Sequence, residues 1–284
     1  MKPTARLVCG VDHSPGAHAA ARFAADLADR LADGLVFVHA VQVPILPSEL
    51  GMTTRTTDWD VIDELRRAGK NLLEELAQEL RPGREVVTEL KFGGASNVIA
   101  AAAEQYGAEL VVVGSRGLGS VSALILGSVS LRLAVHAPRP TVIVPESGGT
   151  IADGPILCAV DDSEESRVAV NTAASLAERL DVRLLLAHAA PDDARVPHGQ
   201  ELLARLVVQS GLGTSAERLV VAGEPAEAIV EVAAGRDVEL IVIGSRGRGA
   251  LTSATLGSVS SAVATRAPCP VTIVRADSPD RVAG

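Results

Sequence analysis

The sequence predicts an α/β protein made of two tandem domains, each a doubly wound, five-stranded parallel sheet flanked by helices. Three observations support this. Apolar runs alternate with helical patterns, the runs are rich in Val, Ile and Leu with little polar alternation, and the whole arrangement occurs twice. Such runs are typical of parallel strands covered on both faces. With 284 residues, the chain is long enough for each copy to have its own core.

Five strands are predicted in each half from these apolar runs. Those of the first half are Arg6–Val11, Leu35–His39, Val86–Leu90, Leu110–Val113 and Thr141–Val144. Those of the second half are Ile156–Val160, Arg183–His188, Arg218–Val221, Leu240–Ile243 and Val271–Val274.

The first helix of each half has a recognisable start. Ser14 is a suitable N-cap and Pro15 suits the first helical position. The second half repeats this start at Ser163, where Glu164 and Glu165 complement the helix dipole. Helical spacing marks the inward faces as Ala20, Phe23, Ala24, Leu27 and Leu31, and as Val168, Thr172, Leu176 and Leu180.

Equal spacings define the repeat. Asp12 to His39 and Asp161 to His188 are both 27 residues apart, while an extra segment of about 19 residues falls near Gln42–Gly69. The residues between the halves, 147–154, are rich in glycine and read as a flexible linker. We therefore predict domains at 1–146 and 155–276, followed by a tail at 277–284.

Composition excludes several classes of protein. The net charge of −9 and an aromatic content of 2% disfavour a nucleic-acid-binding surface. The three cysteines, Cys9, Cys158 and Cys269, form neither a disulfide framework nor a zinc pattern, and we interpret them as buried apolar residues. No segment resembles a membrane span or a secretory leader, so we expect a cytoplasmic protein.

A glycine-spaced loop follows the fourth predicted strand of each half. Gly114-Ser-Arg-Gly117 precedes Gly127-Ser128-Val129-Ser130, and Gly244-Ser-Arg-Gly247 precedes Gly257-Ser258-Val259-Ser260. Glycines let backbone N–H groups approach an anion closely, and the serine hydroxyls offer further hydrogen bonds. We interpret each loop as a polyphosphate site. Further candidate residues in these loops are Arg116, Arg246, Gly119 and Gly249.

The end of the first strand supplies the other side of the predicted site. Ligands of open α/β sheets bind beyond the carboxyl ends of the strands, where the winding reverses. Asp12 and Asp161 lie at such ends and can accept hydrogen bonds from ribose hydroxyls or an adenine amino group. The small residues Gly10 and Ala159 would let a nucleoside lie close. One Gly-x-x-Gly is a weak signal, but the repeated combination favours a nucleotide site.

Other kinds of site find no support. The sequence has no G-x-x-x-x-G-K-[ST] phosphate loop, no G-x-S-x-G nucleophile elbow and no metal-ligand cluster. His39 and His188 occupy equivalent strand ends without a partner carboxylate, and we interpret them as structural. We therefore predict no catalytic residue and no metal ligand.

These motifs resemble those of the universal stress protein family, in its tandem two-domain form, over nearly the whole chain. The resemblance rests on Val11-Asp12-His-Ser14, Val160-Asp161-Asp-Ser163, the pattern Gly-x2-Gly-x9-Gly-Ser at Gly114 and Gly244, Ala137–Val144 and Ala267–Val274. In this family the glycine pattern separates ATP-binding members from the others. The resemblance implies the strand order 3-2-1-4-5 in each half, with the fifth strands pairing antiparallel between halves.

The resemblance also implies one ATP site per half. Asp12 and Asp161 would contact the nucleoside, and Val41 and Ala190 would meet adenine through their backbones. The phosphates would be held by Gly114, Gly117, Gly127 and Ser128, and by Gly244, Gly247, Gly257 and Ser258. It allows a magnesium ion held mainly by the phosphates and water. A homodimer through the fifth-strand region and an unidentified protein partner are further expectations.

The function we predict is ATP-dependent regulation in a stress response, with at most slow ATP hydrolysis. Two alternatives stay open at this point. One is a nucleotide-free dimeric scaffold of the same fold. The other is an adenylating enzyme of the related adenine-nucleotide α-hydrolase group, which the Asp12-His-Ser-Pro15 sequence disfavours because those enzymes usually carry an S-G-G-x-D-S-type loop there.

Overall fold

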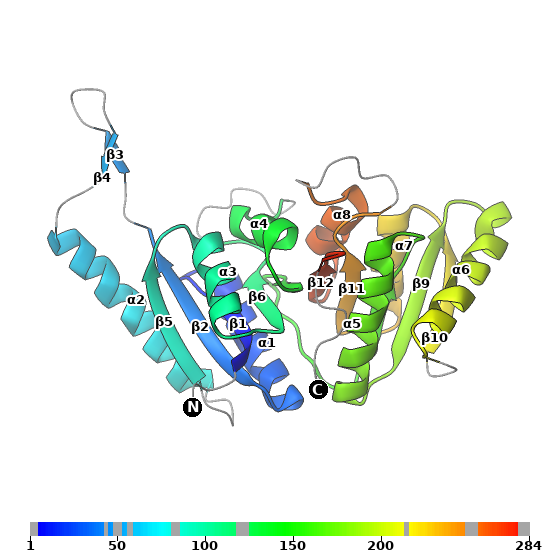
Figure 1. The fold of residues 1–284 in the computed structure, drawn as a ribbon, viewed down its shortest axis with the longest axis horizontal. Helices are drawn as coiled ribbons and strands as arrows, with labels where there is room; N and C mark the ends of the chain where they lie inside the picture. Colours follow the sequence, from blue (N-terminus) through cyan, green and yellow to red (C-terminus); the bar gives the residue numbers. More distant parts are fainter. Residues whose placement is uncertain are drawn as a thin grey trace.

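A single ten-stranded β-sheet runs through both halves of the protein (Figure 1). The computed structural model describes residues 5–42, 45–47, 53–55, 59–80, 86–117, 125–212, 216–247 and 255–277. The strand order across the sheet is β10-β9-β8-β11-β12-β7-β6-β1-β2-β5. Each half therefore has the order 3-2-1-4-5 among its five main strands, which confirms the predicted fold.

The first half alternates strands and helices as predicted. Its elements are β1 (Ala5–Gly10), α1 (Pro15–Leu31), β2 (Gly34–Val41), α2 (Trp59–Leu80), β5 (Val86–Phe92), α3 (Ala95–Gln105), β6 (Leu110–Gly114), α4 (Ser128–His136) and β7 (Thr141–Val144). The extra segment of this half contains a short antiparallel hairpin, β3 (Ile45–Pro47) and β4 (Thr53–Arg55). The hairpin projects from the body of the molecule (Figure 1).

The second half repeats the pattern without that hairpin. Its elements are β8 (Ile156–Ala159), α5 (Glu164–Leu180), β9 (Leu184–Ala190), a 3₁₀ turn (Asp193–Arg195), α6 (Val196–Gln209), β10 (Ala216–Ala222), α7 (Pro225–Gly235), β11 (Leu240–Gly244), α8 (Ser258–Arg266) and β12 (Val271–Val274).

Helices cover both faces of the sheet. On one face α1, α2, α5 and α6 pack over a core that is continuous across both halves. On the other face α3 and α4 cover the first half, and α7 and α8 cover the second. Because side chains alternate along a strand, Leu7 and Cys9 of β1 enter the first layer while Val8 enters the other.

The predicted helix starts are confirmed. Ser14 and Ser163 are the N-caps of α1 and α5, and their hydroxyl oxygens accept hydrogen bonds from the N–H groups of Ala17 and Ser166, each at 3.2 Å. Pro15 occupies the first helical position. The residues predicted for the inward faces of both helices are buried.

The two halves join through their fifth strands, as the family resemblance implied. Thr141–Ile143 of β7 pair antiparallel with Val271–Ile273 of β12. β7 also pairs with β6, and β12 with β11, so both edges of each strand are used within the chain. The edges of β7 and β12 are therefore not open to strand pairing with a second copy, and the expected homodimer through this region stays a prediction.

The segment 147–154 is packed between the halves, although its composition suggested a flexible linker. Ile151 is buried within the continuous core. The N–H of Ala152 donates to Glu239 Oε2 at 2.6 Å, and the Arg30 guanidinium donates to the Ala152 carbonyl. Burial of an apolar residue and satisfied backbone groups hold the segment in place.

Two arginines tie the helices α1 and α5 together in a reciprocal way. Arg30, near the end of α1, donates to the carbonyl of Leu180 at 2.8 Å, while Arg179, near the end of α5, donates to the carbonyl of Leu31 at 3.2 Å. Each arginine thus satisfies a terminal carbonyl of the other helix and interacts favourably with its dipole.

Arg179 also forms ion pairs with two carboxylates of the first half. Its guanidinium lies 2.7 Å from Asp33 Oδ2 and 3.1 Å from Glu109 Oε2, and the two carboxylate side chains are only 5% and 13% exposed.

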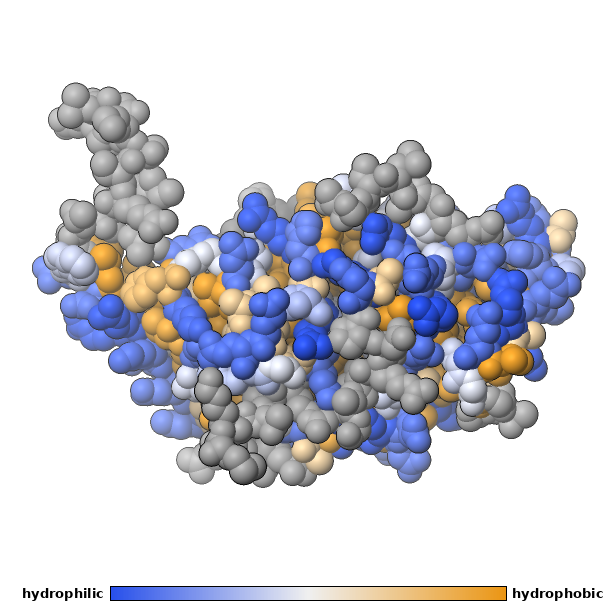
Figure 2. Space-filling view, viewed as in Figure 1, coloured by the Kyte–Doolittle hydropathy of each residue, from blue (hydrophilic) through white to orange (hydrophobic). Residues whose placement is uncertain are grey.

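The three cysteines are free and buried, in agreement with their interpretation as apolar residues. Burial raises the pKa of the Cys9 and Cys158 thiols, and burial together with the nearby Glu239 raises the pKa of Cys269 to about 12. Within the described part of the chain, no helix is long and apolar enough to cross a membrane. On the face shown in Figure 2, hydrophobic residues are interspersed among hydrophilic ones.

Replacing Arg179 by alanine would leave the buried Asp33 and the largely buried Glu109 without their shared cation. We expect Arg179→Ala to lower the free energy of unfolding by about 3 kcal/mol, measured by urea denaturation. The matched control is Arg236→Ala, since Arg236 pairs with Glu217 at the surface, where both side chains are more than 40% exposed. The control should lose less than about 1 kcal/mol. Equal losses in the two variants would contradict the structural role given to Arg179.

Candidate functional site

Two equivalent cavities open where the winding of each half reverses. The first lies beyond the carboxyl ends of β1 and β6 and has a volume of about 570 Å³. The second lies beyond the carboxyl ends of β8 and β11 and has a volume of about 530 Å³. Both volumes fall in the range of small-molecule sites, and both places are the crevices in which open α/β sheets bind ligands.

Most of the predicted site residues meet in these cavities. In the first cavity they are Gly10, Asp12, Gly114, Arg116, Gly117, Gly127, Ser128, Val129 and Ser130. In the second they are Ala159, Asp161, Gly244, Arg246, Gly247, Gly257, Ser258, Val259 and Ser260. Strand ends and glycine loops that are far apart in the sequence, 102 residues from Asp12 to Gly114 and 83 from Asp161 to Gly244, thus form one surface.

Four predicted residues are not part of the cavity walls as described. Val41 and Ala190 are the buried last residues of β2 and β9, and their carbonyls accept hydrogen bonds from Gly93 and Gly223 at 3.0 Å. The neighbouring Ala40, Gln42 and Ala189 line the cavities instead. The other two, Gly119 and Gly249, lie outside the described residues.

The strand-end aspartates are held by the serine that caps the following helix. Asp12 Oδ1 accepts hydrogen bonds from the N–H of Ser14 at 2.9 Å and from its hydroxyl at 2.5 Å. Asp161 Oδ1 accepts the same two bonds from Ser163. A side-chain oxygen bonded two residues ahead is an Asx turn, which explains why this Asp-x-Ser sequence brings the chain from strand to helix.

The second glycine of each loop makes room for the aspartate. A Cβ at Gly117 would lie 2.7 Å from Asp12 Oδ2, and a Cβ at Gly247 would lie closer still to Asp161 Oδ2. Any larger residue would push the carboxylate out of position. The second carboxylate oxygen of each aspartate therefore faces the glycine loop.

The first glycine of each loop has a packing role that sequence reasoning did not assign. A Cβ at Gly114 would lie 2.6 Å from the backbone of Gly16 in α1, and one at Gly244 would lie 2.8 Å from Cβ of Glu165 in α5. These two glycines let the first helix of each half approach the fourth strand. They shape the cavity by allowing this close packing between helix and strand beside it.

The cavity wall opposite the aspartate is the start of α4 or α8. Gly127 is the N-cap of α4, and the first intrahelical bond runs from the N–H of Leu131 to the carbonyl of Gly127 at 2.9 Å. The N–H groups of Ser128, Val129 and Ser130 thus have no intrahelical acceptor, and these three residues line the cavity. Helix α8 begins in the same way after Gly257. Each helix start offers N–H donors and a positive dipole end to an anion.

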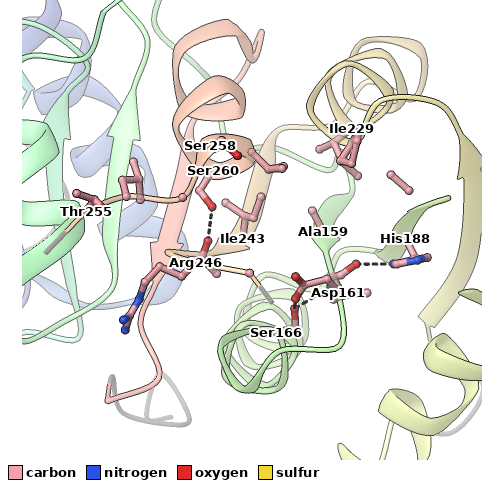
Figure 3. A pocket seen from close by; sticks show the side chains of 18 residues that line it. Ala159, Asp161, Ser166, His188, Ile229, Ile243, Arg246, Thr255, Ser258 and Ser260 are labelled. Atoms are coloured by element: carbon pink, nitrogen blue, oxygen red, sulfur yellow. Dashed lines mark hydrogen bonds between the residues drawn. The ribbon is translucent and has the colours of Figure 1, made fainter. Parts of the chain in front are cut away.

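Part of the predicted hydrogen-bonding capacity is used inside the protein. The N–H of Gly127 donates to the carbonyl of Ser115 at 2.8 Å. The hydroxyl of Ser130 donates within the first loop, and that of Ser260 donates to the carbonyl of Gly244 at 2.6 Å (Figure 3). These groups shape the loop, so the donors left for an anion are mainly the N–H groups of the helix start.

The loop arginines are engaged in ion pairs with glutamates. Arg116 lies 3.4 Å from Glu146, and Arg246 lies 3.2 Å from Glu165. Figure 3 shows the Arg246 side chain pointing away from Asp161. The expected mobile positive charge is thus compensated by a neighbouring carboxylate in both halves.

His39 and His188 line the cavities but serve the fold, as predicted. Their Nδ1 atoms lie 2.8 and 2.9 Å from the carbonyls of Val11 and Val160, which assigns the Nδ1–H tautomer as the donor. The rings pack against helix glycines: a Cβ at Gly69 or Gly199 would lie 2.6 or 2.7 Å from the Cδ2 atom of His39 or His188.

Sequence reasoning missed several apolar residues of the walls. Ile99 and Ile229 lie at the same place in the two cavities. A signal for them was present, because each isoleucine follows its glycine, Gly93 or Gly223, by six residues. The other missed wall residues of the first cavity include Val113, Leu126 and Ala95, and those of the second include Ile243, Leu256 and Pro225.

The arrangement combines three kinds of surface in each cavity. Donors at the helix start suit an anionic group, the aspartate suits hydroxyl or amino groups, and the apolar walls suit a flat ring or an alkyl group. The described part of the chain has no cluster of His, Cys, Asp or Glu that could hold a metal ion. The cavities therefore suit a ligand with an anionic end and a hydrogen-bonding apolar end.

Comparison with known proteins agrees with the fold and the repeat. The sequence model described as "Universal stress protein family" matches residues 4–145 and 154–275. A universal stress protein of Mycolicibacterium smegmatis is 30% identical over 95% of this chain and 96% of its own length. One from Mycobacterium tuberculosis is also 30% identical, with the same coverage of both chains.

Solved structures show the same architecture. The crystal structure of a universal stress protein from Archaeoglobus fulgidus is similar with a TM-score of 0.77. It covers 97% of this chain and 100% of the other chain, at 22% identity. At that identity the likeness concerns the fold.

Gly69→Ala tests the packing of α2 against His39, which lines the first cavity. Alanine favours a helix by about 1 kcal/mol over glycine, but here its methyl group would overlap His39 and Leu90. We expect a net loss of about 1 kcal/mol or more in the free energy of unfolding, measured by urea denaturation. Gly235→Ala in α7 is the control, because its Cβ would meet nothing within 4 Å. A Gly69→Ala variant as stable as this control would show that the close approach to His39 is unimportant.

Proposed function

This chain belongs to the universal stress protein family, and we propose that it is a regulatory protein that binds ATP in both of its cavities. The observation that carries the proposal is the same in each half. A helix start, whose first N–H groups have no intrahelical acceptor, and a strand-end aspartate line one cavity of more than 500 Å³. The phosphates of ATP would bind at the helix start, and its nucleoside would lie toward the aspartate.

The apolar wall residues support the nucleoside part of this assignment. Ile99 and Val113 in the first cavity, and Ile229 and Ile243 in the second, lie near the strand ends. Such side chains give a purine ring dispersion contacts without needing hydrogen bonds. Asp12 and Asp161 would then select for hydroxyl or amino groups at the edge of the nucleoside.

Binding with little chemistry is the second part of the proposal. In each cavity the histidine Nδ1 is committed to a backbone carbonyl and the aspartate to a helix-capping serine. These contacts position structural groups and do not activate a nucleophile or a water molecule. Any ATP hydrolysis should therefore be slow. Magnesium would be held by the phosphates and by water.

A nucleotide-free scaffold is the second candidate, and one observation favours it. Both loop arginines are already neutralised by carboxylates, Arg116 by Glu146 and Arg246 by Glu165. A polyphosphate would have to compete with these pairs for the guanidinium groups. Ultraviolet absorbance near 260 nm after acid denaturation distinguishes the candidates, because a scaffold would release no nucleotide and would show no binding by calorimetry.

Adding Mg-ATP should stabilise nucleotide-free protein against heat. A ligand present at about 100 times its dissociation constant adds roughly 2.7 kcal/mol for each site. For a chain of this size we expect the melting temperature to rise by about 5 °C or more, measured by differential scanning calorimetry. An unchanged melting temperature over a full ATP titration would refute the proposed function.

Substituting the second loop glycine should abolish one site at a time. Gly117→Ala would force Asp12 to move and Gly247→Ala would force Asp161 to move. We expect each variant to bind one ATP where the unmodified protein binds two, and the double variant to bind none, by isothermal titration calorimetry. Gly235→Ala should retain both sites. Full ATP retention in the double variant would show that these loops do not hold the nucleotide.

A further inference from the structure

The two cavities differ in one residue of the first helical turn that follows the strand-end aspartate. In each half this residue comes three positions after the N-cap serine, and it lines the cavity as Ala17 in the first half and Ser166 in the second. Ser166 is 3% exposed. The duplicated halves thus place a methyl group in one wall and a buried hydroxyl in the other.

The hydroxyl of Ser166 binds Asp161 twice. It donates to Asp161 Oδ1 at 2.8 Å and accepts from the backbone N–H of Asp161 at 2.8 Å (Figure 3). Together with the two bonds from Ser163, Asp161 Oδ1 accepts three hydrogen bonds from the first turn of α5 and its cap. The methyl group of Ala17 can make none of the corresponding bonds to Asp12.

The same turn of α5 also holds the glycine loop of its own half. Glu165, next to Ser166, pairs with Arg246 at 3.2 Å, and its side chain is 13% exposed. The equivalent position of α1 is Gly16, which has no side chain to offer. In the first half Arg116 pairs with Glu146, which follows β7 and is 46% exposed. The first turn of α5 therefore fixes both sides of the second cavity, whereas α1 fixes one side of the first.

We propose that Ser166 is a positioning residue that makes the second cavity the higher-affinity nucleotide site. This inference rests on the proposed function. A carboxylate held in one orientation before binding loses less freedom when a ligand hydroxyl or amino group arrives. Ser166 donates its hydrogen to Oδ1, and the second oxygen of Asp161 faces Gly247 of the glycine loop. Ser166 itself acts through Asp161.

The test measures each cavity separately by isothermal titration calorimetry with Mg-ATP. Gly117→Ala leaves the second cavity and Gly247→Ala leaves the first. We expect the second cavity to bind roughly three- to thirty-fold more tightly than the first. Adding Ser166→Ala to the Gly117→Ala background should remove most of this advantage. Adding Ala17→Ser to the Gly247→Ala background should strengthen the first cavity by several-fold.

Two controls separate positioning from a general loss of structure. Ser166→Thr keeps the hydroxyl and should restore affinity. Thr172→Val removes another buried hydroxyl of α5, one that has no hydrogen-bond partner among the described residues, and should leave affinity unchanged. Urea denaturation of every variant shows whether it is folded. The affinity gain expected from Ala17→Ser comes from an added hydroxyl, so a loss of stability cannot account for it.

The outcomes distinguish this inference from the function on which it rests. Binding in the unmodified protein with equal affinities in both cavities, unaffected by Ser166→Ala and Ala17→Ser, would overturn the inference and leave the proposed function standing. Failure of the unmodified protein to bind ATP in either cavity would overturn the proposed function itself. Tight binding in the first cavity and weak binding in the second would also overturn the inference.

Discussion

The antiparallel pairing of β7 with β12 is the constraint on which the rest of the molecule depends. Val142 lies opposite Thr272 at the centre of this short pairing, and the paired residues are almost fully buried. Because the register is symmetric about this point, the halves are related by an approximate two-fold axis. The reciprocal contacts of Arg30 and Arg179 with the ends of α5 and α1 follow from that symmetry. One sheet results, and the core on one of its faces is continuous across both halves, which neither half would have alone.

Within each half, the reversal of winding at the first strand creates the cavity. Helix α1 leaves β1 toward one face of the sheet, while α4 follows β6 on the other face. The crevice between these strand ends brings together an aspartate, a glycine loop and a helix start. The glycine loop and the helix start act through their backbone, and the aspartate side chain is held by the serine two residues ahead. Side-chain changes elsewhere would hardly disturb these local features, so the two halves keep one geometry although their sequences differ.

The two halves differ instead in the side chains that contact the loop arginine and the strand-end aspartate. Arg116 depends on a glutamate beside the segment that joins the halves, whereas Arg246 depends on a glutamate of its own helix. Asp161 gains Ser166 as a partner, and Asp12 faces Ala17 at the same place. Duplication thus supplies two cavities of similar size whose supporting contacts are different. Under the proposed function, such differences would give the two cavities unequal affinities for nucleotide.

The sequence by itself determined the strands, their order of appearance, the helix starts and the paired glycine loops, because these depend on local periodicity, capping and spacing. The residues Ser14, Pro15 and Ser163 were sufficient to locate two helix starts. Only the tertiary structure decided which groups remain available for a ligand. The hydroxyls of Ser130 and Ser260 donate inward, and the loop arginines are paired, since contacts between distant segments consume these groups. The packing of residues 147–154 between the halves was likewise invisible in a glycine-rich composition, because burial depends on what lies beside a segment in space.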